Sequence, residues 1–197
     1  MTTETGELAR LRAGLAARAD DAGLLDIAYR VVDSPLGAML LAATERGVLR
    51  VAFASEGHDA VLADLADRVS PRVLSAPRRL DEAARELDEY FAGHLREITV
   101  PIDLRLLTGY RREVVTALPR IAYGDTASYA ELAALTGRPR AVRAVGSACA
   151  NNPVPLLLPC HRVVRGDGGA GGYLGGLDAK RTLLRLEGTE AGRTVGP

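Results

Sequence analysis

The first hundred residues alternate between short apolar runs and turn residues. Runs of this length, bounded by Asp, Ser, Pro and Gly, are typical of strands. Apolar residues at helical spacing lie on either side of these runs. We predict a meander of strands over 27–32, 38–43 and 48–53, a further strand over 98–104, and helices over 7–25, 58–69 and 79–92. The last of these helices has Leu80, Leu87 and Phe91 on its apolar face.

The second half of the chain changes to a mostly helical pattern. We predict helices over 110–118, 128–136, 139–149 and 177–187. Ser128 and Glu131 form a capping box at the start of the second helix, Gly137 ends it, and Pro139 opens the third. Two short helices joined by a glycine-containing turn match the helix-turn-helix pattern. A packed helical hairpin gives the same pattern and is more common, so the pattern alone does not distinguish the two.

The order of these elements predicts an α+β fold. We expect a small N-terminal α/β domain with a three-stranded antiparallel meander, plus a mostly helical C-terminal domain with a helix-turn-helix. The 197 residues are 47% hydrophobic and 25% charged, which is the balance of a globular protein. We divide the chain into an N-terminal extension over 1–25, an N-terminal domain over 26–104, a C-terminal domain over 105–190 and a tail over 191–197.

Charge is distributed unevenly, although the formal net charge is +0. Residues 1–104 hold 12 basic and 18 acidic side chains, whereas residues 105–165 hold 9 arginines and 3 acidic side chains. An acidic half joined to a basic half indicates that the basic half faces an anion. Chance clustering on a solvated surface is the alternative interpretation.

The composition excludes several classes of protein. With only two cysteines, Cys149 and Cys160, the chain has neither a disulfide framework nor an all-cysteine metal site. No apolar run approaches the roughly 20 residues of a membrane span. The N-terminal twenty residues lack the apolar centre of a signal peptide. We therefore expect a soluble, cytoplasmic protein whose thiols are reduced.

The chemistry is concentrated around Cys160. Three prolines lie at 153, 155 and 159, so this segment takes a rigid, extended path, and the apolar run 156–158 should be buried. Cys160 follows directly and is next to His161 and Arg162. A thiolate is a nucleophile, and a neighbouring histidine or cation favours it. The alternative is a buried structural thiol, which is the usual role of an isolated cysteine.

A glycine-rich segment follows the cysteine. Residues 166–176 contain seven glycines, and no phosphate-loop fingerprint fits them. Tyr173 is the one large aromatic side chain there and could form a wall against a planar ligand. A flexible surface turn is the alternative. Glu187, at the end of the last predicted helix, could orient a histidine, although its spacing alone also fits a solvated glutamate.

These residues carry a resemblance to a known family. Pro159-Cys160-His161-Arg162-Val163, preceded by Asn152-Pro153-Val154-Pro155 and followed by Gly172-Tyr173-Leu174-Gly175-Gly176, resembles the signature of the O6-alkylguanine-DNA alkyltransferases. These are also called methylated-DNA–protein-cysteine methyltransferases. The resemblance is dense over 124–188 and continues more loosely back to residue 27.

The resemblance implies direct DNA repair. The alkyl group of O6-alkylguanine, and of O4-alkylthymine, would move irreversibly to Cys160 in a single turnover, after the nucleotide is flipped out from the minor groove. The implied partner is double-stranded DNA, with no cofactor, no metal and no membrane. We expect a monomer, and cooperative assembly on DNA is left open. The region 105–190 would be the DNA-binding and alkyl-transfer domain.

The resemblance also implies roles for individual residues. Cys160 matches the alkyl acceptor, His161 the base acting through a water, and Glu187 the acid that orients the histidine. Asn152 matches the asparagine of the turn before the active site. Tyr129 matches the tyrosine that helps to rotate the nucleotide and donates a proton to guanine.

Further matches concern DNA and the flipped base. Arg143 matches the finger that fills the gap left by the base. The expected DNA-binding residues are Arg143, Tyr129, Ala141, Val142, Ser147 and Arg140, the last as a phosphate contact. The expected walls of the base pocket are Tyr173 and the backbone at Val163 and Gly175.

Three other functions compete with this reading. An alkyltransferase-like module that only flags damaged DNA would lack the acceptor cysteine, which is present here as Cys160. A cysteine hydrolase would turn over many times. A plain helix-turn-helix regulator would need neither the cysteine motif nor the glycine-rich segment. One departure from the family pattern is Val115, where the family often has tryptophan.

Overall fold

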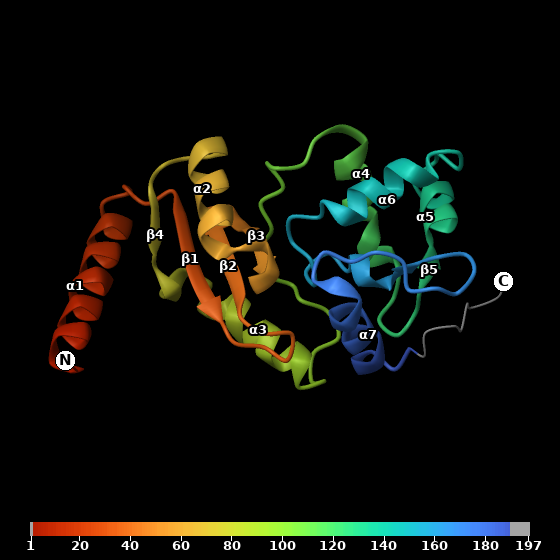
Figure 1. The fold of residues 1–197 in the computed structure, drawn as a ribbon. Coiled ribbons are helices and arrows are strands. Elements are labelled where there is room, and N and C mark those ends of the chain that lie inside the picture. The colour runs from red at the N-terminus through yellow and green to blue at the C-terminus, as the bar shows by residue number, and fades with distance from the viewer. Residues whose placement is uncertain (1, 190–197) are drawn as a thin grey trace.

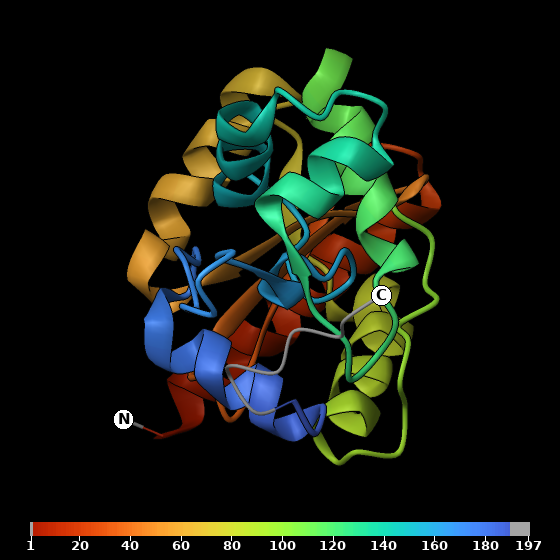
Figure 2. The same ribbon diagram turned by 90° about the vertical axis from the view of Figure 1, so that its right-hand side faces the viewer.

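The computed structural model describes residues 2–189 of the chain, so the predicted tail over 191–197 lies outside the described residues. The N-terminal half forms one end of the molecule around a sheet, and the C-terminal half forms the other end from helices (Figure 1). This confirms the predicted α+β fold class. Figure 2 views the C-terminal half end-on, with the strands behind it.

The sheet has four strands in the order β3-β2-β1-β4. Their bounds are β1 (Ile27–Val32), β2 (Met39–Thr44), β3 (Gly47–Phe53) and β4 (Val73–Ser75). The predicted antiparallel meander is confirmed, with Val31 opposite Leu40 and Leu41 opposite Val51. The sequence pattern missed β4, which pairs parallel to β1, because three residues are too few to show a period.

Both faces of the central strand β2 are covered, which explains its unbroken apolar run. Leu40 and Ala42 pack with Val61 and Leu65 of α2 (His58–Arg68). Met39, Leu41 and Ala43 face the opposite way, toward α3 (Asp81–Phe91). The same apolar cluster continues into the C-terminal helices, so one core joins the two halves.

Two predictions in the N-terminal half are wrong in detail. The first helix, α1 (Thr2–Asp21), ends four residues before the predicted boundary at 25, and Gly23 follows it at a φ of 65°. The predicted strand over 98–104 makes only one isolated bridge, between Ile102 and Val48. Pro101 has no N–H to extend a ladder there. The loop lies so close to Gly47 that a side chain at Gly47 would collide with the Pro101 carbonyl.

The C-terminal half consists of short helices and one small parallel sheet. Its elements are α4 (Gly109–Ala117), β5 (Ala127–Ser128), α5 (Tyr129–Leu135), α6 (Val142–Ala150), β6 (Val163–Val164) and α7 (Gly176–Leu186). Short 3-10 helices lie in both halves of the chain. The N-terminal half has η1 (Ala54–Glu56) and η2 (Pro77–Leu80), and the C-terminal half has η3 (Leu118–Arg120) and η4 (Cys160–Arg162). Within residues 2–189 no helix is both long and apolar enough to cross a bilayer.

The helix pair α5–α6 follows the sequence pattern closely at its start. The capping box is confirmed, since the Glu131 N–H donates to Ser128 Oγ at 3.1 Å and the Ser128 N–H donates to the Glu131 carboxylate at 2.5 Å. The start of α6 is a correction. The Ala141 N–H bonds the Arg138 carbonyl at 2.8 Å in a turn, so the helix begins at Val142 rather than at 139.

A candidate active site around Cys160

Cys160 begins η4 and lies at the end of the proline-rich segment. The segment is buried as predicted, and Leu156 takes a φ of 75°, which is unusual for a residue with a side chain. The Cys160 side chain is 3% exposed. Burial raises the pKa of its thiol to about 11, while the Asn152 side chain and the Lys180 charge oppose that increase. The thiol therefore needs a base to become a nucleophile at neutral pH.

His161 is positioned to be that base. Its ring is fully buried, and its Nε2 lies 2.9 Å from Glu187 Oε1. Because an ionised carboxylate only accepts hydrogen bonds, Nε2 carries the proton and Nδ1 is the basic nitrogen. Nδ1 has no protein partner among residues 2–189. Burial lowers the pKa of His161 despite Glu187, which favours the neutral ring.

Glu187 is the most heavily hydrogen-bonded group of the site. It is 4% exposed, which decides against a solvated surface glutamate. Arg162 Nε donates to Oε2 at 2.9 Å and Arg162 Nη2 donates to Oε1 at 3.0 Å. The hydroxyl of Tyr90, on α3, also donates to Oε1, at 2.6 Å. Burial alone would raise the pKa of Glu187, but these bonds and that of His161 lower it to about 2.

Tyr90 is a residue that the sequence analysis missed. The pattern placed Phe91 on the apolar face of this helix, yet Tyr90 is 2% exposed and Phe91 only partly buried. Tyr90 lies three residues after Leu87, so helical spacing allowed it on the same face. A buried tyrosine hydroxyl requires a hydrogen-bond partner, and that requirement is the signal that could have found it.

Asn152 ties the rigid segment together. Its side-chain amide donates to the Leu158 carbonyl at 2.7 Å, and its Oδ1 accepts from the Val154 N–H at 3.1 Å. Next to it, the Pro153 carbonyl accepts from the Val51 N–H at 2.8 Å and from Arg50 Nη1 at 3.2 Å. Strand β3 therefore braces the turn that precedes Cys160.

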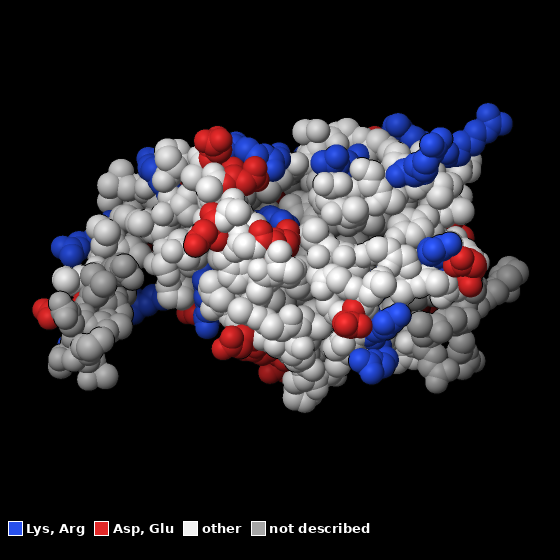
Figure 3. All heavy atoms as spheres, in the orientation of Figure 1, with Lys and Arg blue, Asp and Glu red and all other residues white. Residues whose placement is uncertain are grey.

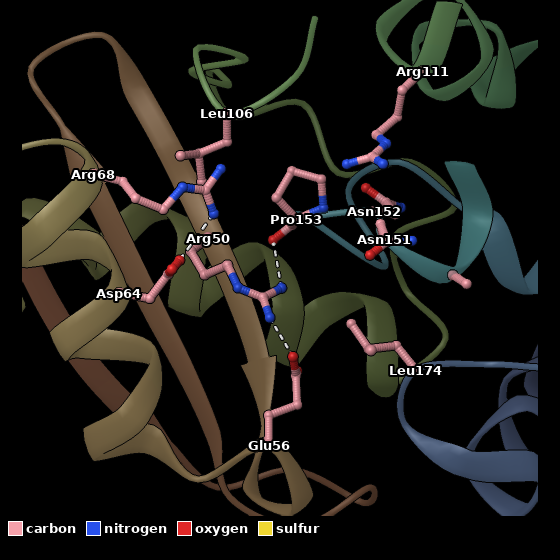
Figure 4. A pocket seen from close by; sticks show the side chains of 11 residues that line it. Arg50, Glu56, Asp64, Arg68, Leu106, Arg111, Asn151, Asn152, Pro153 and Leu174 are labelled. Carbon is pink, nitrogen blue, oxygen red and sulfur yellow. Dashed lines mark hydrogen bonds and ion pairs between the residues drawn. The ribbon is translucent and has the colours of Figure 1, made fainter. Parts of the chain in front are cut away.

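A hollow opens beside this brace, and Figure 4 shows its lining. Arg50 points across the hollow toward Pro153 and pairs with Glu56. Arg68 of α2 lies on the side of the hollow opposite Asn151 and Asn152 and pairs with Asp64 at 2.9 Å. Both halves of the molecule line this hollow, which places the brace at their boundary.

Two tyrosines lie close to the reacting groups. The Tyr173 ring meets the Phe53 ring edge-on at 5.6 Å and the His161 ring at 6.3 Å between centroids. Its hydroxyl is buried without a partner within residues 2–189. Tyr129 packs against Gly171, where a side chain would press on the tyrosine ring. Burial raises the pKa of the Tyr129 hydroxyl, so it remains a proton donor.

The two expected backbone positions of the pocket differ in their surroundings. A side chain at Gly175 would reach 2.8 Å from the Phe53 ring, so a larger residue there would require the ring or the backbone to shift. The Val163 carbonyl accepts from Lys180 Nζ at 2.5 Å, a contact that the sequence analysis did not foresee. Lys180 is fully buried, and burial lowers its pKa to about 8.

Apart from Tyr129, which begins α5 near the thiol, the expected DNA-binding residues lie on α6 or in the turn before it. Arg143 and Ser147 are exposed and four residues apart, so they share one face of the helix. Val142 is also exposed, whereas Arg140 and Ala141 lie in the turn before the helix. Figure 3 shows Lys and Arg atoms gathered along the edge over the C-terminal helices.

The chain is similar over most of its length to one family. The family model described as 6-O-methylguanine DNA methyltransferase, ribonuclease-like domain, matches residues 27–104. The model described as 6-O-methylguanine DNA methyltransferase, DNA binding domain, matches residues 109–189. A methylated-DNA–protein-cysteine methyltransferase of Mycolicibacterium paratuberculosis is 39% identical over 161 residues, which are 82% of this chain and 92% of that protein.

Solved structures agree with these matches. The crystal structure of Mycobacterium tuberculosis OGT in complex with DNA superposes with a TM-score of 0.70 at 38% identity, covering 81% of this chain and 92% of that one. The structure of the Mycobacterium tuberculosis O6-methylguanine methyltransferase gives a TM-score of 0.72 at 35% identity, covering 86% and 96%.

Proposed function

The chain belongs to the 6-O-methylguanine DNA methyltransferase family, and we propose that it repairs duplex DNA by moving the alkyl group of an O6-alkylguanine irreversibly onto Cys160. As a member of this family it is a methylated-DNA–protein-cysteine methyltransferase, which repairs DNA by alkyl transfer to one of its own cysteines. The observation that carries the assignment of Cys160 is its place next to a buried histidine whose Nε2 lies 2.9 Å from Glu187 Oε1.

The transfer step follows from these positions. His161 Nδ1 takes the proton of the Cys160 thiol through a water, and the sulfur attacks the alkyl carbon. A carbon–sulfur bond forms as the bond from carbon to guanine O6 breaks, and guanine leaves as an anion. Tyr129, whose hydroxyl is protonated at the start, supplies the proton that neutralises it. Tyr129 then regains a proton from solvent while His161 releases the one that it took, so both side chains return to their starting states. The thioether has no leaving group, so each molecule reacts once.

The damaged base must leave the duplex to reach a buried thiol. Flipping costs roughly a few kcal/mol, and a side chain that fills the gap offsets part of that cost. Exposed Arg143 on α6 is the longest side chain on the face that we assign to the minor groove. Arg140, in the preceding turn, contacts phosphate, and Ala141, Val142 and Ser147 let the helix approach the groove.

The flipped base would lie between Tyr173 and the backbone around Val163 and Gly175. Two features support this pocket: a side chain at Gly175 would collide with Phe53, and the Tyr173 hydroxyl is buried without a protein partner within residues 2–189. O4-alkylthymine presents the same kind of O-alkyl group and is the second substrate that we propose. Asn152 keeps the turn beside Cys160 in place.

Counting alkyl groups tests this function. Protein is incubated with an excess of duplex that contains O6-methylguanine, and the intact mass is followed over time. We expect a gain of one methyl group per molecule and then no further reaction. Repeated turnover would favour a cysteine hydrolase, and binding without any mass gain would favour a module that only flags the lesion.

A further inference from the structure

The N-terminal domain contributes one hydroxyl group to the hydrogen bonds around His161 and Glu187. Tyr90 lies on α3, 97 residues from Glu187 and 71 from His161 in the sequence. Its hydroxyl oxygen lies 2.6 Å from Glu187 Oε1 and 3.5 Å from His161 Nε2. The tyrosine therefore touches both members of the pair that prepares the base.

This hydroxyl is a fixed donor. Burial raises the pKa of Tyr90, and the negative charge of Glu187 raises it further, so the proton stays on the tyrosine. The ring is held edge-on by Tyr123 at 6.3 Å and by Phe91 at 5.6 Å between centroids. A side chain that is rigid and always protonated can supply the same hydrogen bond at every working pH.

Glu187 Oε1 is shared by three donors. It accepts from Tyr90 at 2.6 Å, from His161 Nε2 at 2.9 Å and from Arg162 Nη2 at 3.0 Å. The bond from Tyr90 draws negative charge away from the side of the carboxylate that faces the imidazole. A carboxylate oxygen that carries less negative charge stabilises the imidazolium less, and the imidazole of His161 then remains neutral.

We propose that Tyr90 is a positioning residue, which acts through Glu187 to keep His161 neutral and its Nδ1 available to the Cys160 thiol. This inference rests on the proposed role of His161 as the base. It gives the N-terminal domain a part in the chemistry, although every group that reacts belongs to the C-terminal half. The other titratable groups around His161 are Glu187, Arg162, Lys180, Cys160 and Tyr173.

Tyr90→Phe removes the hydroxyl and keeps the ring. Without it, Oε1 acts more strongly on the Nε2 proton, so the pKa of His161 should rise by about half to one pH unit. The single-turnover rate with O6-methylguanine duplex falls as His161 becomes protonated in acid. This fall in rate, the acid limb, should therefore shift to a correspondingly higher pH. Well above that limb the rate should stay within about twofold of the unaltered protein, because the neutral ring is the same.

Tyr123→Phe is the matched control. The Tyr123 hydroxyl donates to the Leu186 backbone carbonyl at 3.1 Å, one residue before Glu187, and its ring packs against Tyr90. It loses one hydroxyl from the same region without touching the carboxylate. We expect its rate profile to coincide with that of the unaltered protein.

A direct titration keeps the test independent of activity. The chain has only three histidines, so the imidazole signals of His161 can be assigned by NMR with a His161→Gln variant and followed against pH in each protein. A higher pKa of His161 in Tyr90→Phe alone supports the inference. Equal shifts in Tyr90→Phe and Tyr123→Phe, or no shift in either, would overturn it.

The proposed roles of His161 and of Tyr90 can fail separately. If the unaltered protein shows no acid limb and His161→Gln reacts at the normal rate, the base role of His161 fails and the role of Tyr90 with it. If the limb is present but Tyr90→Phe leaves it in place, only the role of Tyr90 fails. A loss of thermal stability with an unmoved limb would mean that the hydroxyl serves folding alone.

Discussion

The two halves of the molecule bury different kinds of side chain. Between residues 26 and 104 the buried polar or charged residues are Thr44, Glu86 and Asp103, and the rest of the core is apolar. Between 105 and 189 they are Ser128, Asn152, His161, Arg162, Lys180, Glu187 and Thr189. Buried charges contribute little net stability unless they are fully paired. The buried polar groups available for chemistry thus lie mainly in the C-terminal half. Burying them costs free energy of folding, which their hydrogen bonds must offset.

The N-terminal half supplies rigid supports on both sides of Cys160. Arg50 and Val51 hold the Pro153 carbonyl before the cysteine, and Tyr90 holds Glu187 behind the histidine. The apolar cluster that includes Met39 and Leu41 continues into the C-terminal helices, so these supports belong to one packed core. The difference indicates that a domain without reactive groups can still determine how well a reaction runs.

The largest expected effect comes from removing the nucleophile. Cys160→Ser should abolish alkyl transfer, because a hydroxyl is a much weaker nucleophile than a thiolate. DNA binding measured by gel shift should be nearly unchanged, since we assign that binding to the surface of α6. Residual transfer by this variant would move the acceptor to Cys149 on α6 and would contradict the role assigned to Cys160.

The next effect concerns the step before chemistry. Arg143→Ala should slow repair of duplex O6-methylguanine by about 10²-fold, which corresponds to about 2–3 kcal/mol of lost support for the flipped state. Reaction with free O6-benzylguanine, which needs no flipping, should change by less than about twofold. The two rates are measured by single-turnover kinetics.

Arg140→Ala is the control for Arg143. Because Arg140 lies in the turn before α6, its loss should weaken DNA affinity and leave the transfer step almost unchanged. Equal losses on duplex and on free base for Arg143→Ala would mean that this arginine supports the fold or the pocket rather than the flipped state.

The pH dependence tests whether the buried histidine works as a neutral base. Burial lowers the pKa of His161 below its usual 6.5, so the ring should be neutral at pH 7 and become protonated only in acid. The transfer rate should fall as pH decreases, with a midpoint below 6.5 and a loss of at least about tenfold at the acid end. A midpoint above 6.5 would contradict the neutral ring.

The smallest effect concerns the brace on the N-terminal side. Arg50→Met removes the bond to the Pro153 carbonyl and the pairing with Glu56, and should slow transfer a few-fold while lowering stability by about 1–2 kcal/mol. Arg68→Met is the control, because Arg68 lines the same hollow but pairs only with exposed Asp64 (Figure 4). Thermal melts and rates that match between the two variants would argue against the brace.

Patterns with several repeats were predicted well from the sequence. The meander and the start of α5 were found because alternation and the capping box are local signals. The strand β4 was missed because it has three residues. A full strand was predicted over 98–104, but only one bridge forms, at Ile102, because Pro101 cannot extend the ladder. The start of α6 was misplaced because Pro139 suits a turn as well as a helix start.

The active site was harder to predict because its members are far apart in the sequence. His161 and Glu187 are 26 residues apart, and spacing alone allowed Glu187 to be a surface residue. Their pairing was expected only from the resemblance to a family. Lys180 and Tyr90 were missed entirely, since a lysine or tyrosine on a helix gives no local sign that it will be buried against a distant carbonyl or carboxylate.

Peptide mapping after reaction tests the central claim most directly. The chain has two cysteines, both buried, and burial raises the pKa of Cys149 to about 12 and that of Cys160 to about 11. Only Cys160 is next to His161, the base that we propose. After reaction with O6-methylguanine duplex, mass spectrometry of the digested protein should find the methyl group on Cys160 alone. A methyl group on Cys149, or on any other residue, would contradict the account.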